Sequence, residues 1–215
     1  MVLIEDTGVA LDWGDMPVLP SDFGFPGVQT PPAAAAISAD SLSEALVQRP
    51  ALYSRHGVSW ISARSWRDQI KKQNVQMLRQ VKRSLDPAIT ELAAHDIADA
   101  VRSIAGPLPD WTVSTTPVGH SRRPDSFAVR VAEGVASRFG CPFVKVFEDR
   151  FLSGSSHPLQ FARLPPLKQA ADIRGPILLV DDVATSGFHM HESLTFIRNL
   201  NVTAFGAVWI CGTVK

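Results

Sequence analysis

The sequence lacks the features that mark secreted, membrane and metal-rich proteins. Its 215 residues include only two cysteines, Cys141 and Cys211, and their separation matches neither a metal-binding spacing nor a disulfide scaffold. We predict that both are buried reduced thiols. No apolar run approaches the ~20 residues that cross a bilayer, and the start MVLIEDTG has no basic segment ahead of an apolar core. We therefore expect a cytoplasmic protein without membrane contact.

The sequence also lacks net charge, since 21 bases balance 21 acids. No whole-chain attraction to nucleic acid or to an anionic membrane is therefore expected. The charges are unevenly distributed: residues 1–50 hold seven acids and one base, which leaves 14 acids and 20 bases for the rest. A mildly basic body suits an anionic ligand.

The pattern of apolar residues along the sequence changes near residue 107. Residues 1–106 begin with a Pro-, Gly- and Ala-rich arm, and continue with short strands near residues 2–4 and 58–61 and two helices over 65–85 and 87–105. After residue 107, apolar strands alternate with helices, which indicates an α/β fold with a parallel sheet flanked by helices. We predict a core over 107–215 and a mostly helical N-terminal extension over 1–106. The expected core strands are 111–115, 142–147, 177–180 and 202–210, and its helices are 125–139 and 190–200.

The helix predicted over 65–85 is strongly basic. A nucleic-acid contact and a solvated amphipathic face are the two interpretations, and we favour the solvated face. Zero net charge and the lack of a base-reading motif argue against nucleic acid. The bases are Lys71, Lys72, Arg79, Lys82 and Arg83.

The stretch ILLVDDVATSGFH, residues 177–189, carries the clearest chemistry. Ligands bind at the carboxyl ends of parallel strands, and we expect Asp181 and Asp182 to stand at such an end. Thr185, Ser186 and Gly187 follow as a tight turn before a helix, whose amino terminus offers N–H groups and a positive dipole to an anion. Carboxylates for vicinal hydroxyls next to a phosphate site suit a ribose 5-phosphate.

Three other interpretations of the paired acids agree less well with the sequence. A receiver domain needs most of its fold after the acids, whereas 33 residues follow Asp182. A Walker B strand needs an upstream G-x-x-x-x-G-K-[ST], which the sequence does not contain. Simple capping of the next helix requires less than two acids and a Thr-Ser-Gly turn.

The stretch resembles the phosphoribosyl-pyrophosphate signature of the type I phosphoribosyltransferases at twelve of its thirteen positions. The exception is His189, where the family usually has Thr or Ser. The resemblance implies that Asp181 and Asp182 hold the ribose 2- and 3-hydroxyls. It also implies that the 5-phosphate is held by Thr185, Ser186, Gly187 and Phe188, with His189 as a further donor. The spacing of His189 and His191 would also allow a metal site, but without further ligands we prefer the phosphate reading.

A second segment, STTPVGHSRRPDS over 114–126, lies where the family binds pyrophosphate, just ahead of a helix. Its candidate ligands are Gly119, His120, Arg122 and Arg123; the alternative is a surface loop with solvated arginines. The layout is similar to that of the competence-associated phosphoribosyltransferase-like proteins. Those usually carry a four-cysteine zinc module, which two cysteines cannot form.

Residues 148–175 form a long segment without a regular pattern, at the place of the family's flexible catalytic lid. Such a lid would exclude water and add positive charge where pyrophosphate departs. Its candidate cations are Arg150, His157, Arg163, Lys168 and Arg174.

The resemblance implies an enzyme that transfers a phosphoribosyl group to or from a nitrogenous base, with Mg²⁺ carried by the substrate and no direct protein ligand. The base is undetermined, and residues 1–106 are expected to supply the hood that selects it. The alternative is a non-catalytic sensor of phosphoribosyl pyrophosphate or a nucleotide on the same fold. A homodimer is a further expectation.

Overall fold

The computed structural model describes residues 3–5, 42, 44–67, 72–117, 125–150 and 165–214. Its strands form one sheet in the order β1-β2-β3-β6-β5-β4. They are β1 (Leu3–Glu5), β2 (Leu46–Arg55), β3 (Val58–Trp66), β4 (Thr112–Thr115), β5 (Ile177–Ala184) and β6 (Ala204–Thr213). The helices are α2 (Lys72–Ser84), α3 (Pro87–Ala105), α4 (Phe127–Phe139) and α5 (Phe188–Asn199).

The sheet is mixed, and so the predicted parallel sheet is only partly confirmed. Strands β3, β6, β5 and β4 run parallel, while β2 pairs antiparallel with β3 as a hairpin and β1 pairs parallel with β2. The sequence did not reveal β2, because Pro50 interrupts it and a proline is normally excluded from a strand interior. Pro50 lies at a register shift between Gln48 and Ala51, where the pairing of β2 with β3 is interrupted.

The helix predicted over 65–85 begins too early. Ser65 and Trp66 belong to β3, and α2 begins at Lys72. Trp66 is buried at the end of β3, where it pairs with Thr213 of β6. Its apolar side chain fitted a helical spacing equally well, because a short apolar run does not distinguish a strand from a helix. The helices α3 and α4 lie where the sequence places them.

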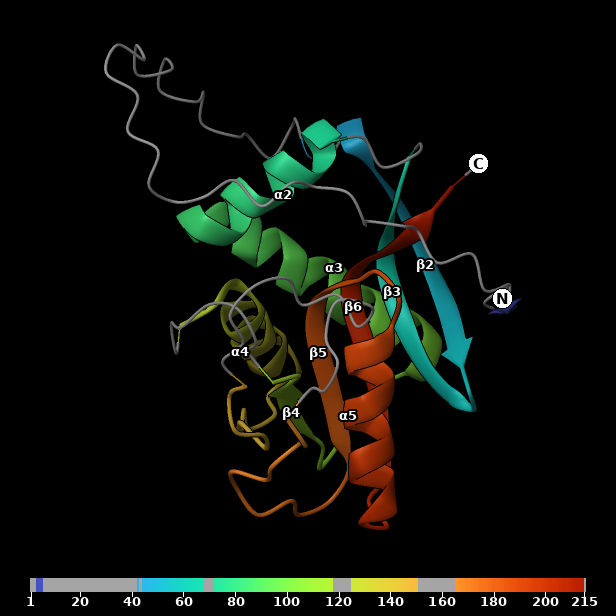
Figure 1. Ribbon diagram of the computed structural model, residues 1–215, viewed down its shortest axis with the longest axis vertical. Helices are drawn as coiled ribbons and strands as arrows, with labels where there is room; N and C mark the ends of the chain where they lie inside the picture. The colour runs from blue at the N-terminus through green and yellow to red at the C-terminus, as the bar shows by residue number, and fades with distance from the viewer. Residues whose placement is uncertain are drawn as a thin grey trace.

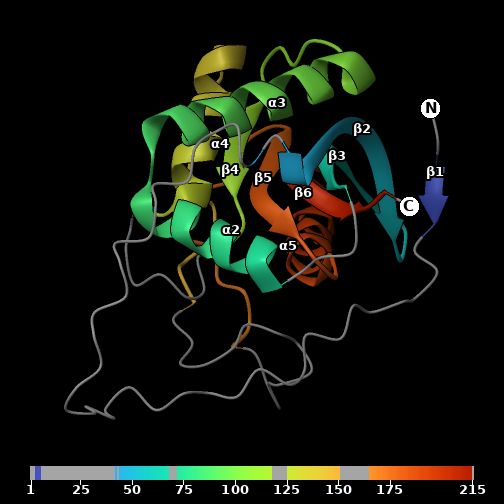
Figure 2. The ribbon, with the colours of Figure 1, turned by 90° about the horizontal axis from the view of Figure 1, so that it is seen from above.

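Helices cover both faces of the sheet (Figures 1 and 2): α3 and α4 lie on one side and α5 on the other. Alternate residues of β5 follow this division. Leu178 and Val180 belong to the core under α3 and α4, whereas Ile177 and Leu179 belong to the core under α5. All four side chains are buried, which explains why β5 reads as a continuous apolar run.

A buried ion pair joins α3 to the sheet. The guanidinium of Arg64 on β3 donates two hydrogen bonds to Asp96 of α3, at 2.5 and 3.1 Å. The indole N–H of Trp209 on β6 donates to the same carboxylate at 2.9 Å. Asp96 is 4% exposed, so its charge is compensated by these partners and not by water. The residues before and after 106 therefore share one core.

The strand predicted over 142–147 does not form. Phe143 makes one isolated bridge to Val113, and Phe147 makes another to Gln169. The four residues of β4 offer a short edge, and beyond Val144 the chain pairs instead with residues 168–170. The prediction that both cysteines are buried is confirmed for Cys211, whereas Cys141 is only half-buried. None of the helices within the described ranges is both long enough and apolar enough to cross a membrane.

Candidate functional site

The two acids lie inside β5, which continues to Ala184 instead of ending at residue 180 as predicted. Asp182 is buried and Asp181 half-buried. The backbone N–H of Asp182 donates to Oδ1 of Asp181 at 2.8 Å, and the hydroxyl of Thr116, just after β4, also donates to the Asp181 carboxylate. Two carboxylates therefore meet at the carboxyl edge of β4 and β5, where a parallel sheet binds its ligands.

A lysine from the N-terminal half of the chain contacts this acid pair. Lys82 lies near the end of α2. This helix lies beyond the carboxyl ends of β5 and β6 (Figure 1). Its Nζ is 2.9 Å from Oδ1 of Asp182, and its side chain is 38% exposed. The prediction of a solvated basic face on this helix is therefore wrong for Lys82, which makes an ion pair at the site.

The pKa values of Asp181 and Lys82 are both shifted from their ordinary values. Burial and the neighbouring charge of Asp182 raise the pKa of Asp181 to about 7, while Lys82 and the hydrogen bonds from the Asp182 N–H and from Thr116 oppose the rise. Burial lowers the pKa of Lys82, but the attraction of Asp182, its hydrogen bond and the charge of Asp181 outweigh this and raise it. The acid pair thus changes its charge close to neutral pH.

This shift predicts a pH-dependent stability. The folded state holds a proton on Asp181 up to about pH 7, whereas the ordinary pKa is 3.8. The folded state then binds more protons than the unfolded state between these values, so the free energy of unfolding should fall as pH rises from about 4 to 7. Asp181→Asn should remove this slope and exceed the wild type in stability at pH 8. Urea unfolding at pH 5, 6, 7 and 8 tests this; equal slopes in both proteins would contradict it. Asp99→Asn, at an exposed site, should retain the wild-type slope.

The turn after β5 leads directly into α5. Gly187 is the N-cap of α5 at φ +66°, and this helix has no side-chain N-cap among the described residues. By contrast, Asp86 accepts from backbone N–H groups at the start of α3, and Ser126 does so at the start of α4. In α5 the cap residue has no side chain, and the Ser186 hydroxyl accepts from the Phe188 N–H at a long 3.4 Å. A helix start with such weak side-chain capping suits a bound anion. The helix begins at Phe188, so His189 lies in its first turn.

Gly187 is also required by packing. A Cβ on this residue would lie 2.4 Å from Cη2 and 2.6 Å from Cζ2 of Trp60 on β3. Trp60 is itself buried, so it cannot easily yield. The tight turn thus rests directly on the β2–β3 hairpin.

Gly187→Ala should therefore destabilise the protein by about 1–3 kcal/mol through collision with Trp60, beyond about 1 kcal/mol for the left-handed backbone. Gly140→Ala is a matched control, because Gly140 has the same φ of +66° and nothing lies within 4 Å of its Cβ position. Urea unfolding of both variants separates the two costs. Equal losses in the two variants would show that Trp60 does not restrict position 187.

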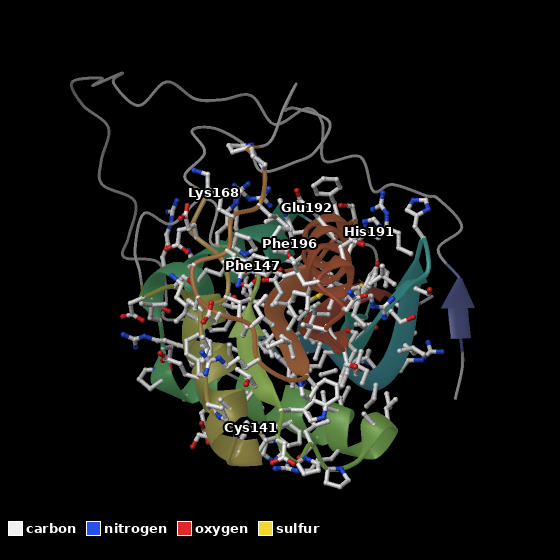
Figure 3. The ribbon with its side chains drawn as sticks, turned by 90° about the horizontal axis from the view of Figure 1, so that it is seen from below. Cys141, Phe147, Lys168, His191, Glu192 and Phe196 are labelled. Carbon is white, nitrogen blue, oxygen red and sulfur yellow. The ribbon has the colours of Figure 1, made fainter. Side chains whose placement is uncertain are left out.

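The hairpin brings basic side chains to the turn. Nη1 of Arg55 donates to the backbone oxygen of Ser186, and the ring of His56 meets that of His191 edge-on at 5.5 Å between centroids. Burial, followed by His56 and Arg55, lowers the pKa of His191, while Glu192 acts in the opposite direction. Figure 3 shows His191 and Glu192 on α5, with Phe196 of the same helix beside Phe147. The phosphate end of the candidate site thus has a guanidinium from β2 and the imidazole of His191 from α5.

The predicted lid residues have different surroundings. Arg150 is buried and makes a bidentate ion pair with Glu192 of α5 at 2.6 and 3.0 Å, and it also donates to the Pro165 oxygen. Lys168 is exposed, with Nζ 4.0 Å from Oε2 of Glu148, and Arg174 is exposed beside Asp172. His157 and Arg163 lie outside the described residues, as do the predicted pyrophosphate ligands Gly119, His120, Arg122 and Arg123.

Three residues of the site did not emerge from the sequence. Lys82 was one base among several on an amphipathic helix, Arg55 belonged to a strand that Pro50 concealed, and Thr116 stood in a hydroxyl-rich run, STT. Only the last had a local signal, because hydroxyl residues at a strand end suit a polar site. Within the described residues, no group of three or more His, Cys, Asp and Glu side chains could hold a metal ion.

Comparison with known proteins finds no matching family model and no matching curated protein. Among solved structures, the chain is similar to the orotate phosphoribosyltransferase from Aeropyrum pernix, with 16% identity and a TM-score of 0.39 over 78% of this chain and 76% of that one.

Proposed function

We propose that the protein binds a ribose 5-phosphate group, as phosphoribosyl pyrophosphate or as a nucleotide, and transfers the phosphoribosyl group to or from a nitrogenous base. The observation that carries this is the uninterrupted strand–turn–helix unit. Asp181 and Asp182 lie two to three residues before the end of β5, residues 185–187 form the turn, and the cap residue of α5, Gly187, has no side chain. Carboxylates accept hydrogen bonds from vicinal hydroxyls, and a helix start whose cap residue lacks a side chain can bind a phosphate. One ribose 5-phosphate presents both groups.

Different residues of the site would bind the sugar hydroxyls and the phosphate of this ligand. Asp181 and Asp182 would accept from the 2- and 3-hydroxyls, and the amides and hydroxyls of Thr185, Ser186, Gly187 and Phe188 would hold the phosphate. His189 in the first turn of α5 would be a further donor, supported by Arg55 beside the Ser186 oxygen. The pyrophosphate ligands, the lid and the homodimer stay predictions from the family resemblance.

In the transfer, a nitrogen of the base forms a bond to the anomeric carbon while the bond from that carbon to the pyrophosphate oxygen breaks. The pyrophosphate leaves with the electron pair, and the configuration at the carbon inverts. Catalysis rests on holding the two reactants in line and on neutralising the departing charge, and requires no protein nucleophile. The carboxylates fit a Mg²⁺ ion that arrives chelated by pyrophosphate, which would supply charge neutralisation; the described residues contain no closed set of metal ligands.

The experiment has two parts. Isothermal titration calorimetry with ribose 5-phosphate and with phosphoribosyl pyrophosphate and Mg²⁺ tests binding, and pyrophosphate release with a panel of purine and pyrimidine bases tests transfer. Binding with turnover supports the enzyme. Binding without turnover on any base supports the sensor, which the histidine at position 189 favours because it departs from the signature. Failure to bind any ribose phosphate overturns both.

A further inference from the structure

Lys82 is the charged partner of the acid pair, although it lies 100 residues before Asp182. Its Nζ is 2.9 Å from Oδ1 of Asp182, and its charge also acts on Asp181. Lys82 comes from α2, outside the strand–turn–helix unit that carries the proposed function. The role inferred for Lys82 below rests on that proposed function, and it adds Lys82 to the residues of the ribose site.

The surroundings of the acid pair explain why a cation is needed. From β5 itself come two adjacent carboxylates, which repel each other. From the residue after β4 comes a neutral hydroxyl, that of Thr116, and from α2 comes the ammonium of Lys82. With that ammonium in place the pKa of Asp181 is about 7. Without it the acid pair would keep its proton to a higher pH, because like charges in low dielectric disfavour full ionisation. A protonated carboxyl is a weaker acceptor for a sugar hydroxyl than a carboxylate.

We propose that Lys82 is a positioning residue of the ribose site, which lowers the pH at which the acid pair becomes fully ionised, so that both carboxylates accept from the ribose hydroxyls from about neutral pH upward. It also makes α2 part of the site, so that the N-terminal half of the chain contributes to ribose binding. A purely structural ion pair is the rival explanation. The Lys82 side chain is 38% exposed but that of Asp182 is 9% exposed, so removing Lys82 also costs some stability. The pH profile of binding separates the two explanations, because a purely structural ion pair would not shift it.

The test measures ribose 5-phosphate binding by calorimetry from pH 6 to 9 in the wild type, Lys82→Met and Lys82→Arg. Arg83→Met is the matched control, since Arg83 is an exposed base on the same helix. Lys82→Met should shift the pH of half-maximal affinity upward by about one to three units. A one-unit shift from pH 7 weakens binding at pH 7 by about fivefold, and the difference should narrow toward pH 9. Lys82→Arg and Arg83→Met should keep the wild-type profile. The ligand phosphate titrates near pH 6 in every case, so the comparison between variants is the readout.

A second readout needs no ligand. Carboxyl ¹³C NMR should show Asp181 titrating near pH 7 in the wild type and higher in Lys82→Met. An unchanged titration and an unchanged binding profile overturn the role of Lys82 while leaving ribose binding intact. A shifted titration in a chain that binds no ribose phosphate overturns the proposed function instead. Lys82→Gln is the second neutral variant. If both neutral variants fail to fold while Lys82→Arg folds, Lys82 acts through stability and the proposal is wrong.

Discussion

Replacing both acids, by Asp181→Asn with Asp182→Asn, is expected to weaken ribose 5-phosphate binding by at least about 100-fold. Each carboxylate would lose a charge-assisted hydrogen bond to a sugar hydroxyl, and such bonds contribute about 1.5–3 kcal/mol each. Any phosphoribosyl transfer should fall with the binding. Isothermal titration calorimetry at pH 8, where Asp181 is ionised in the wild type, gives the clearest comparison.

The control for this variant removes two negative charges elsewhere. Asp99→Asn with Glu133→Gln changes exposed side chains on α3 and α4, and its binding should match the wild type. The double asparagine variant should remain folded, because loss of the mutual repulsion between the acids offsets loss of the ion pair to Lys82. A folded double asparagine variant that binds like the wild type would place the ribose site elsewhere.

Asp96→Ala should have the largest effect on stability, a loss of about 3–5 kcal/mol, because it leaves the Arg64 charge buried without its partner. Arg64 is 9% exposed, and its guanidinium makes both of its described hydrogen bonds to Asp96. The same substitution deprives the indole N–H of Trp209 of its acceptor. Urea unfolding at pH 7 measures the loss.

Asp99→Ala is the control for position 96, since Asp99 lies on the same helix with its side chain 47% exposed and paired with Arg102. Its loss should stay within about 1 kcal/mol, as for exposed ion pairs. The double variant Arg64→Met with Asp96→Leu should recover much of the stability, because no uncompensated charge remains. A double variant no more stable than Asp96→Ala would show that the cost comes from packing and not from the buried charge.

Local patterns were sufficient wherever one short segment holds all the necessary information. Asp86-Pro87 predicted the start of α3, and the carboxylate of Asp86 does accept from the N–H groups of Ala88 and Ile89. The apolar run before Asp181 predicted a buried strand, and β5 is buried on both faces. Elements that depend on distant partners were harder to predict. The strand β2 contains Pro50 and forms because β3 pairs with it beyond a bulge.

The same division applies to the candidate site. The sequence by itself determined the order of acids, hydroxyl turn and helix start, because these groups lie within thirteen residues and their spacing follows from strand and helix geometry. Only the tertiary structure decided that Lys82 neutralises Asp182, that Trp60 excludes a side chain at Gly187, and that Arg55 reaches Ser186. These partners are 100, 127 and 131 residues apart in sequence. Charge, volume and hydrogen bonding act over a few ångströms in space, and a local pattern does not show which distant residue the folded chain will bring within that range.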